Sequence, residues 1–162
     1  MHRRTTPPSA AQTRPIGASA PQSPAVRGVE DLWGPYAAVV DVVRVELADD
    51  PTVDITTTGR LTGLPRRIEI WMLDVDGCFF ITGTPGQRDW LANLHADPNL
   101  VVHLKRHAHF DLAARAMPVT DAATRSAVLE HLSATWYRTQ QPLGVLVETS
   151  PMVEVMFSGT AA

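Results

Sequence analysis

The feature that most constrains this fold is a series of short β-branched and apolar segments separated by Gly and Pro. Residues 67–75 alternate in side-chain character with the two-residue period of a strand. Asp76–Gly77 follows directly, and a type I′ turn favours Asp-Gly because both of its central residues need a positive φ. Residues 78–82 are therefore predicted to return as an antiparallel partner. Hairpins of this kind build a largely antiparallel sheet rather than parallel βαβ units.

Strand character recurs along the chain between further Gly- and Pro-containing turns. The additional predicted strands are residues 52–57, 100–104 and 108–117. A last pair of extended segments is expected within residues 145–157, around Ser150–Pro151. Closing or partly closing such a sheet into a barrel would remove its unpaired edges.

Helical spacing of apolar residues predicts three helices between or beside these strands. They span residues 36–48, 88–96 and 120–135. The sequence therefore predicts an α+β domain, built as a mainly antiparallel barrel with flanking helices.

Length and composition predict one folded domain preceded by a tail. The chain has 162 residues, and 44% of them are hydrophobic, which is enough to form a core. Residues 1–28 are rich in Pro, Ala, Ser and Thr, and such a segment buries too little surface to offset the entropy lost on ordering. We therefore expect a disordered tail over residues 1–28 and a folded domain over residues 29–162.

Charge and cysteine content narrow the classes of function. The net charge is −3, whereas a general nucleic-acid binder needs a basic face to neutralise phosphates. Cys78 is the single cysteine, which excludes an internal disulfide and a multi-cysteine zinc site. No apolar run approaches the length of a membrane-spanning helix. We expect a cytoplasmic protein that binds neither nucleic acid nor membrane.

The first candidate site is the segment 56–67, which joins two predicted strands. It combines threonines, glycines and three arginines, namely Arg60, Arg66 and Arg67. Glycines allow close approach of the backbone to a ligand, and arginines bind phosphate or carboxylate groups in bidentate fashion. The segment is therefore either an anion-binding loop or an ordinary hairpin with solvated arginines, and chemistry alone leaves both interpretations open.

The second candidate site is the Gly- and Pro-containing loop 83–88, which leads into the helix predicted at 88–96. Free N–H groups and the positive end of the helix dipole make such a junction a possible anion site. Asp89 suits the first helical turn electrostatically. Trp90 either stacks on a flat cofactor or packs in the core, and Asn93 either bonds a ligand or caps a turn.

The two segments together resemble the deazaflavin-dependent nitroreductase family, a branch of the flavin/deazaflavin split β-barrel oxidoreductases. The first motif is Thr57-Thr58-Gly59-Arg60-Leu61-Thr62-Gly63-Leu64-Pro65-Arg66, and the second is Asp89-Trp90-Leu91-Ala92-Asn93-Leu94-His95-Ala96-Asp97-Pro98. Their order and separation are also similar to the family pattern. Glu69-Ile70-Trp71 resembles the quinone-reductase-like branch more than the best-known nitroreductase branch.

This resemblance implies a split β-barrel oxidoreductase that binds coenzyme F-420, an 8-hydroxy-5-deazaflavin, and forms a homodimer. Hydride would pass from the reduced cofactor to a small organic acceptor: a nitro compound, a quinone or an enone. Arg60 and Arg66 would hold the cofactor's phosphate and oligoglutamate tail, while other residues would lie along its ring and ribityl chain. The cofactor-binding residues implied in this way are Thr58, Gly59, Arg60, Gly63, Pro65, Arg66, Thr84, Pro85, Trp90 and Asn93.

Several alternatives stay open from the sequence. FMN also carries a phosphate, so the same fold could use FMN instead, and a non-catalytic binder of a deazaflavin, haem or another flat ligand is a third reading. No catalytic residue can be assigned, and no metal site is predicted. His103, His107 and His109 are interpreted as solvated hairpin residues rather than metal ligands, because no carboxylate or cysteine accompanies them at a regular spacing. Trp136–Tyr137 forms either a pocket wall or a packing cluster.

Overall fold

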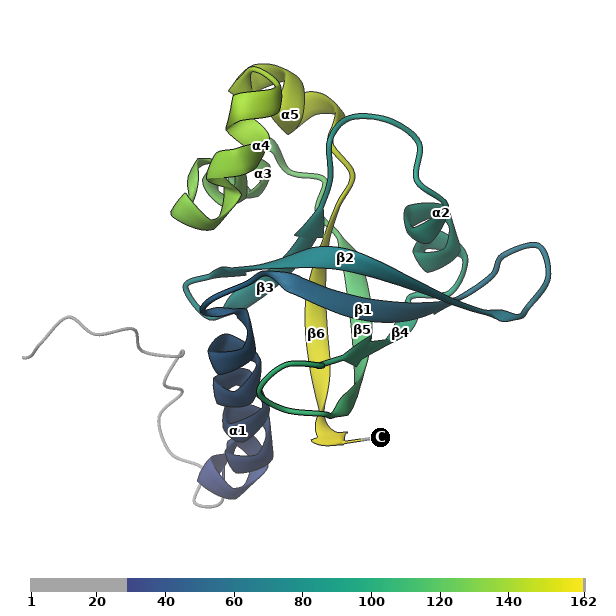
Figure 1. The fold of residues 1–162 in the computed structure, drawn as a ribbon, viewed down its shortest axis with the longest axis vertical. Helices are drawn as coiled ribbons and strands as arrows, with labels where there is room; N and C mark the ends of the chain where they lie inside the picture. The colour runs from purple at the N-terminus through teal and green to yellow at the C-terminus, as the bar shows by residue number, and fades with distance from the viewer. Residues whose placement is uncertain (1–28, 162) are drawn as a thin grey trace, which may run out of the picture.

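Six antiparallel strands close into a barrel in the computed structural model, which describes residues 29–161 (Figure 1). The strand order around the barrel is β1-β2-β3-β6-β5-β4, and β4 pairs back to β1. The strands are β1 (Thr52–Thr58), β2 (Pro65–Val75), β3 (Cys78–Thr82), β4 (Asn99–His103), β5 (Asp111–Pro118) and β6 (Met152–Ala161). The predicted antiparallel barrel is confirmed, whereas the tail predicted over residues 1–28 lies outside the described residues.

The Asp76–Gly77 turn forms as the sequence predicts. Asp76 has φ 54° and Gly77 has φ 87°, and the strands on either side pair from Val75 with Cys78 to Met72 with Ile81. The period of two then directs alternate side chains of each strand inward. On β1, Val53, Ile55 and Thr57 are buried, while the residues between them are partly exposed.

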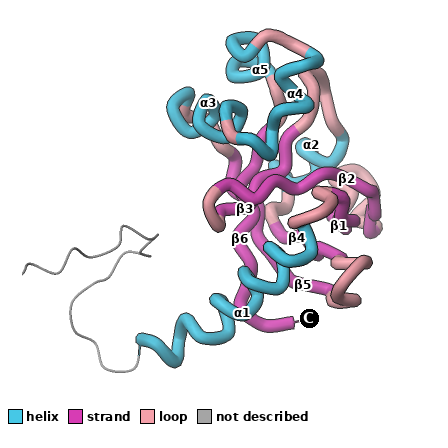
Figure 2. The backbone as a smooth tube through the Cα atoms, turned by 60° about the vertical axis from the view of Figure 1, so that its left-hand side comes forward, coloured by secondary structure: helices cyan, strands magenta, loops and turns pink. Residues whose placement is uncertain are grey.

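Helices flank the barrel of strands, as Figures 1 and 2 show. The long helix α1 (Val29–Leu47) packs against β6, and Val43 belongs to the main core inside the barrel. The short helix α2 (Asp89–Ala96) lies beside β1. No helix in residues 29–161 is long and apolar enough to cross a membrane.

The segment after β5 differs from the prediction. In place of one helix over residues 120–135 and an extended segment from residue 145, the chain forms α3 (Ala122–Glu130), a 3-10 turn (Leu132–Ala134), α4 (Thr135–Gln140) and α5 (Leu143–Thr149). The extended prediction was wrong before Ser150, because Val145 and Val147 favour strands locally whereas tertiary packing decides the outcome, and it is confirmed after Pro151 by β6. Leu146 is fully buried in a second core under these helices.

Arg125 and Tyr137 hold this helical unit together. The Arg125 guanidinium donates to the carbonyls of Val147, Val119 and Ser150 at 2.5, 2.9 and 2.5 Å, so it joins α3 to α5 and to the chain beside β5 and β6. The Tyr137 ring makes edge-to-face contacts with Trp136 and Trp71 at centroid distances of 5.2 and 6.0 Å. Trp136–Tyr137 is therefore a packing cluster that seats the helices on β2.

A buried carboxylate fixes the loop between β4 and β5. Glu46 of α1 is fully buried, and its two carboxylate oxygens accept the backbone N–H groups of Lys105, Arg106, His107 and Ala108 at 2.6–3.1 Å. Burial alone would raise the pKa of Glu46, but the four donors outweigh it and hold the pKa below its usual value. The Glu46 carboxylate therefore attaches the β4–β5 loop to α1.

Candidate functional site

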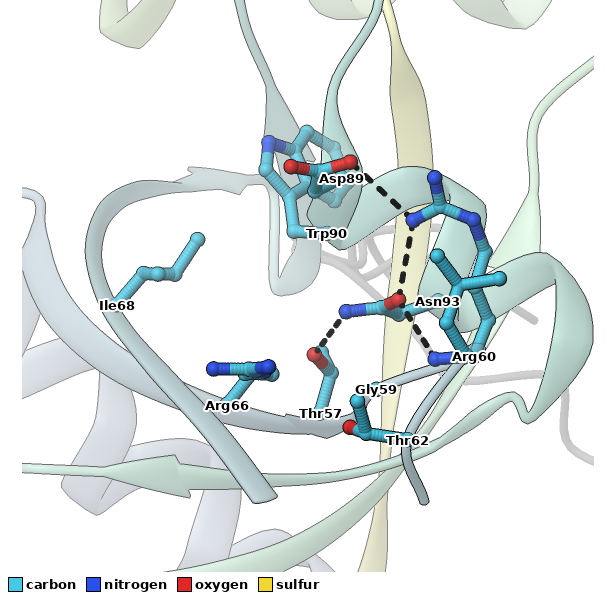
Figure 3. Close-up of a pocket in the computed structure, with 10 residues that line it drawn as sticks. Thr57, Gly59, Arg60, Thr62, Arg66, Ile68, Asp89, Trp90 and Asn93 are labelled. Atoms are coloured by element: carbon cyan, nitrogen blue, oxygen red, sulfur yellow. Dashed lines mark hydrogen bonds and ion pairs between the residues drawn. The ribbon is translucent and has the colours of Figure 1, made fainter. Parts of the chain in front are cut away.

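A cavity of about 340 Å³ opens between the β1–β2 loop and α2 (Figure 3). The two walls come from the two sequence motifs, which the fold therefore brings together. The lining residues are Thr57, Gly59, Arg60, Leu61, Thr62, Arg66, Ile68, Asp89, Trp90 and Asn93.

The β1–β2 loop has a tight shape that glycine makes possible. The Gly59 N–H donates to the Leu64 carbonyl at 2.8 Å, and the Gly63 N–H donates to the Gly59 carbonyl at 2.7 Å. Gly63 has φ 68°, which side chains rarely allow. A Cβ on Gly59 would lie 2.9 Å from the Thr62 hydroxyl oxygen and 3.1 Å from the Leu64 carbonyl oxygen. The loop thus places the Arg60 backbone beside α2 with little room to adjust.

Asn93 joins the two walls of the cavity. It is 5% exposed, its Nδ2 donates to Thr57 Oγ1 at 3.1 Å, and its Oδ1 accepts the Arg60 backbone N–H at 3.0 Å. Both ends of the amide are therefore used within the protein, and Figure 3 shows the side chain bridging the floor of the cavity. Asn93 acts as a positioning residue for the arginine loop.

An Asn93→Ala variant should lose both stability and ligand affinity. Removing the amide leaves the Arg60 N–H and the Thr57 hydroxyl without their partner, and the expected loss in free energy of unfolding is about 1–3 kcal/mol. Urea unfolding and a cofactor titration of the same sample measure the two effects. Asn99→Ala is the matched control, because the Asn99 side chain is exposed and bonds only locally to Asp97. Equal effects of the two variants would contradict the role of Asn93.

The cavity carries positive charge on its loop side. Arg60 Nη1 lies 3.2 Å from Asp89 Oδ1 and 3.4 Å from Asn93 Oδ1. Arg66 lines the same cavity, whereas the next residue, Arg67, bonds Asp54 Oδ2 at 2.9 Å on the other face of β2. Two guanidinium groups facing one open cavity form a site suited to phosphate or carboxylate groups.

The cavity also has apolar lining on two of its walls. Trp90 is 8% exposed and belongs to the main core, which confirms the prediction that it packs in the core. The same residue also lines the cavity. Ile68 on β2 faces the cavity from the opposite wall (Figure 3). A flat apolar group could therefore lie between Trp90 and Ile68 while an anionic group reaches the arginines.

Half of the residues predicted for cofactor binding line this cavity, and half do not. Gly59, Arg60, Arg66, Trp90 and Asn93 line it. The others, Thr58, Gly63, Pro65, Thr84 and Pro85, are not among its lining residues. The Thr84 carbonyl and hydroxyl oxygens both accept from Arg88 Nη2 at 2.9 Å, which shapes the loop before α2.

Five lining residues were not in the predicted cofactor-binding set, although four of them stand in the two motifs: Thr57, Leu61, Thr62, Ile68 and Asp89, of which only Ile68 lies outside both. The strand period could have identified Thr57 and Ile68, since each continues the inward-facing series of its strand. For Asp89 the sequence suggests a helix-stabilising role, because its contact with Arg60 spans 29 residues and leaves no local signal.

The histidine interpretation needs one correction. His103 is buried, its Nδ1 lies 2.6 Å from Asp111 Oδ1, and its Nε2 lies 2.7 Å from Thr56 Oγ1. A carboxylate does accompany this histidine, supplied by the pairing of β4 with β5. His107 and His109 are exposed, as predicted. Within residues 29–161, no group of three His, Cys, Asp or Glu side chains could hold a metal ion.

Solved structures with this fold include two similar proteins. A protein related to general stress protein 26, of the pyridoxinephosphate oxidase family from Clostridium acetobutylicum, has a TM-score of 0.58 and 14% identity over 74% of this chain and 84% of that chain. HutZ, the heme storage protein from Vibrio cholerae, has a TM-score of 0.57 and 12% identity over 75% and 92%. At such identities the likeness shows the split-barrel fold alone. A comparison with curated proteins gives no match.

A protein-family model supplies the assignment that structural likeness does not. The model described as F420H(2)-dependent quinone reductase matches residues 36–150, a range that contains the barrel strands β1–β5, both motifs and the whole cavity. The chain therefore belongs to the F420H(2)-dependent quinone reductase family and is an oxidoreductase whose cofactor is coenzyme F-420.

Proposed function

We propose that this protein reduces a quinone with reduced coenzyme F-420, bound in the cavity between the β1–β2 loop and α2. The observation that carries the proposal is the lining of that cavity, which combines the guanidinium groups of Arg60 and Arg66 with the apolar side chains of Trp90 and Ile68. A nitro compound and an enone are the other acceptors of the same class.

The residues present fit this cofactor. Its phosphate and oligoglutamate tail are anionic, and Arg60 and Arg66 offer charged donors to the cavity. Its ring system is flat and largely apolar, like the space beside Trp90. The segment Thr84–Pro85 lies in the loop before α2 and would extend the site along the ribityl chain of the cofactor. The site residues in this proposal are those implied by the family motifs.

The protein's own part in the reaction is binding and orientation. When bound, the reduced cofactor supplies a hydride, and the chain excludes water around it. Trp90 and Ile68 would limit access of solvent to the reacting face, while Asn93 keeps the arginine loop in register with α2. Tyr137 has no proton-donor role in this proposal, because it does not line the cavity and its hydroxyl donates to the Thr82 carbonyl oxygen at 3.4 Å.

A homodimer is part of the proposal. The side chains of Leu61, Leu64 and Ile68 are 86%, 60% and 36% exposed, and they stand on the hairpin at the mouth of the cavity. A second copy of the chain packed there would cover apolar surface and narrow the opening. Light scattering after size-exclusion chromatography measures the mass directly, and a monomer at high protein concentration would contradict this part.

The proposed function is tested by turnover. The purified protein, reduced coenzyme F-420 and a water-soluble quinone are mixed, and the absorbance of the deazaflavin reports its oxidation. We expect quinone-dependent oxidation that a nitroaromatic and an enone support more slowly. Tight cofactor binding without turnover of any of these acceptors would favour a binding protein instead.

A further inference from the structure

We propose that Asp89 is a specificity-determining residue, a built-in carboxylate that occupies Arg60 until the anionic part of the cofactor displaces it. The Asp89 carboxylate lies 3.2 Å from Arg60 Nη1 and lines the same cavity. This inference rests on the proposed site, because it requires that an anionic group of the ligand reach Arg60.

The geometry makes Asp89 the displaceable partner of Arg60. The Asp89 side chain is 90% exposed and stands on the first turn of α2, whereas Asn93 is buried and bonded at both ends of its amide. An ion pair this exposed adds little stability and is screened by salt. An incoming phosphate or carboxylate can therefore replace Asp89 while Asn93 keeps the loop in place.

The charges that line the cavity determine which ligands the Asp89–Arg60 ion pair disfavours. Among the lining residues, Asp89 is the single acid and faces the two cations Arg60 and Arg66. A ligand that does not reach Arg60 leaves the ion pair intact and is indifferent to Asp89. A ligand that does reach it must break the pair and then lie near a negative charge, which opposes binding. Asp89 thus lowers affinity for ligands whose anionic group reaches Arg60 and leaves the affinity of other ligands unchanged.

A purely local role for Asp89 makes a different prediction. An acidic residue in the first turn of a helix favours the helix dipole. If that were its whole function, Asp89→Asn would lower stability slightly and leave cofactor binding unchanged. If Asp89 instead held Arg60 in its binding orientation, the same variant would weaken binding.

The experiment compares two ligands on three proteins. Wild type, Asp89→Asn and Glu148→Gln are titrated with coenzyme F-420 and with the ribityl deazaflavin that lacks the phosphate and tail. Quenching of tryptophan fluorescence reports binding. Glu148 is an exposed acid on α5, so its variant removes the same charge away from the cavity. Urea unfolding of each protein records any change in stability.

We expect Asp89→Asn to bind coenzyme F-420 about two- to fivefold more tightly than wild type at low salt, the range for an exposed ion pair. Its affinity for the ribityl deazaflavin should stay unchanged, the gain should vanish at high salt, and Glu148→Gln should match wild type. Unchanged or weaker F-420 binding, or equal tightening for both ligands, would overturn the inference. A wild-type protein that binds neither ligand would instead overturn the proposed site.

Discussion

The double variant Arg60→Ala, Arg66→Ala should bind coenzyme F-420 about two to four orders of magnitude more weakly than wild type. Each guanidinium is expected to form charged hydrogen bonds with the phosphate or tail, and each such contact contributes about 1.5–3 kcal/mol. Both side chains line the cavity from the loop side. A fluorescence titration at constant ionic strength measures the change, and the weakening should shrink as salt is raised.

Arg67→Ala provides a matched control for this variant. Arg67 neighbours Arg66 on β2, but its side chain lies on the other face of the strand and bonds Asp54. The variant removes one positive charge beside the site, half of what the double variant removes, and that charge does not line the cavity. Cofactor affinity should therefore stay close to that of wild type. A loss in Arg67→Ala as large as in the double variant would mean that net charge, not the cavity, determines binding.

Glu46→Gln should lower the free energy of unfolding by about 2–4 kcal/mol at neutral pH. The carboxylate accepts four backbone N–H groups in the β4–β5 loop, and a glutamine side chain presents an N–H₂ group to some of them. Buried donors without an acceptor cost about 1–3 kcal/mol each. Urea unfolding measures the loss, and Glu148→Gln, which changes an exposed acid, should differ little from wild type.

The effect of Glu46 should also depend on pH in a defined direction. Its pKa is lower in the folded protein than the usual 4.5, because the four N–H donors stabilise the charged form more than burial destabilises it. A lowered pKa gives stability that is complete above the unfolded pKa and is lost as the pH falls through the folded pKa. The difference between wild type and Glu46→Gln should therefore be constant near neutrality and shrink in acid below that value. A difference that grows in acid would contradict this assignment.

Local patterns were sufficient to predict most of the barrel. β3 begins and ends where predicted, and the predicted β1 is one residue short, because the Asp-Gly turn and the β-branched run define them within a few residues. The helix α5 could not be predicted this way. Its β-branched residues favour a strand, and only Arg125 and the neighbouring helices, distant in sequence, supply the contacts that make it helical.

The site was predicted in part for the same reason. Arg60, Arg66, Trp90 and Asn93 stand within the two ordered motifs, so the family resemblance that these motifs carry implied their presence at one site. The contacts that define their roles are long-range: Asn93 bonds Thr57, 36 residues away, and Asp111 reaches His103 across a strand pair. A side chain's partner across the barrel leaves no periodic signal in the sequence.

The bond between the Arg60 amide and the Asn93 side chain gives the protein a built-in reporter of motion. Most barrel amides are protected from hydrogen exchange by strand pairing, so they exchange when the sheet itself opens. The Arg60 N–H is protected instead by a side chain of α2. The hydrogen-exchange rate of this amide therefore measures how often α2 separates from the β1–β2 hairpin, independently of barrel unfolding. A ligand that holds both walls of the cavity together would slow the exchange of that one amide.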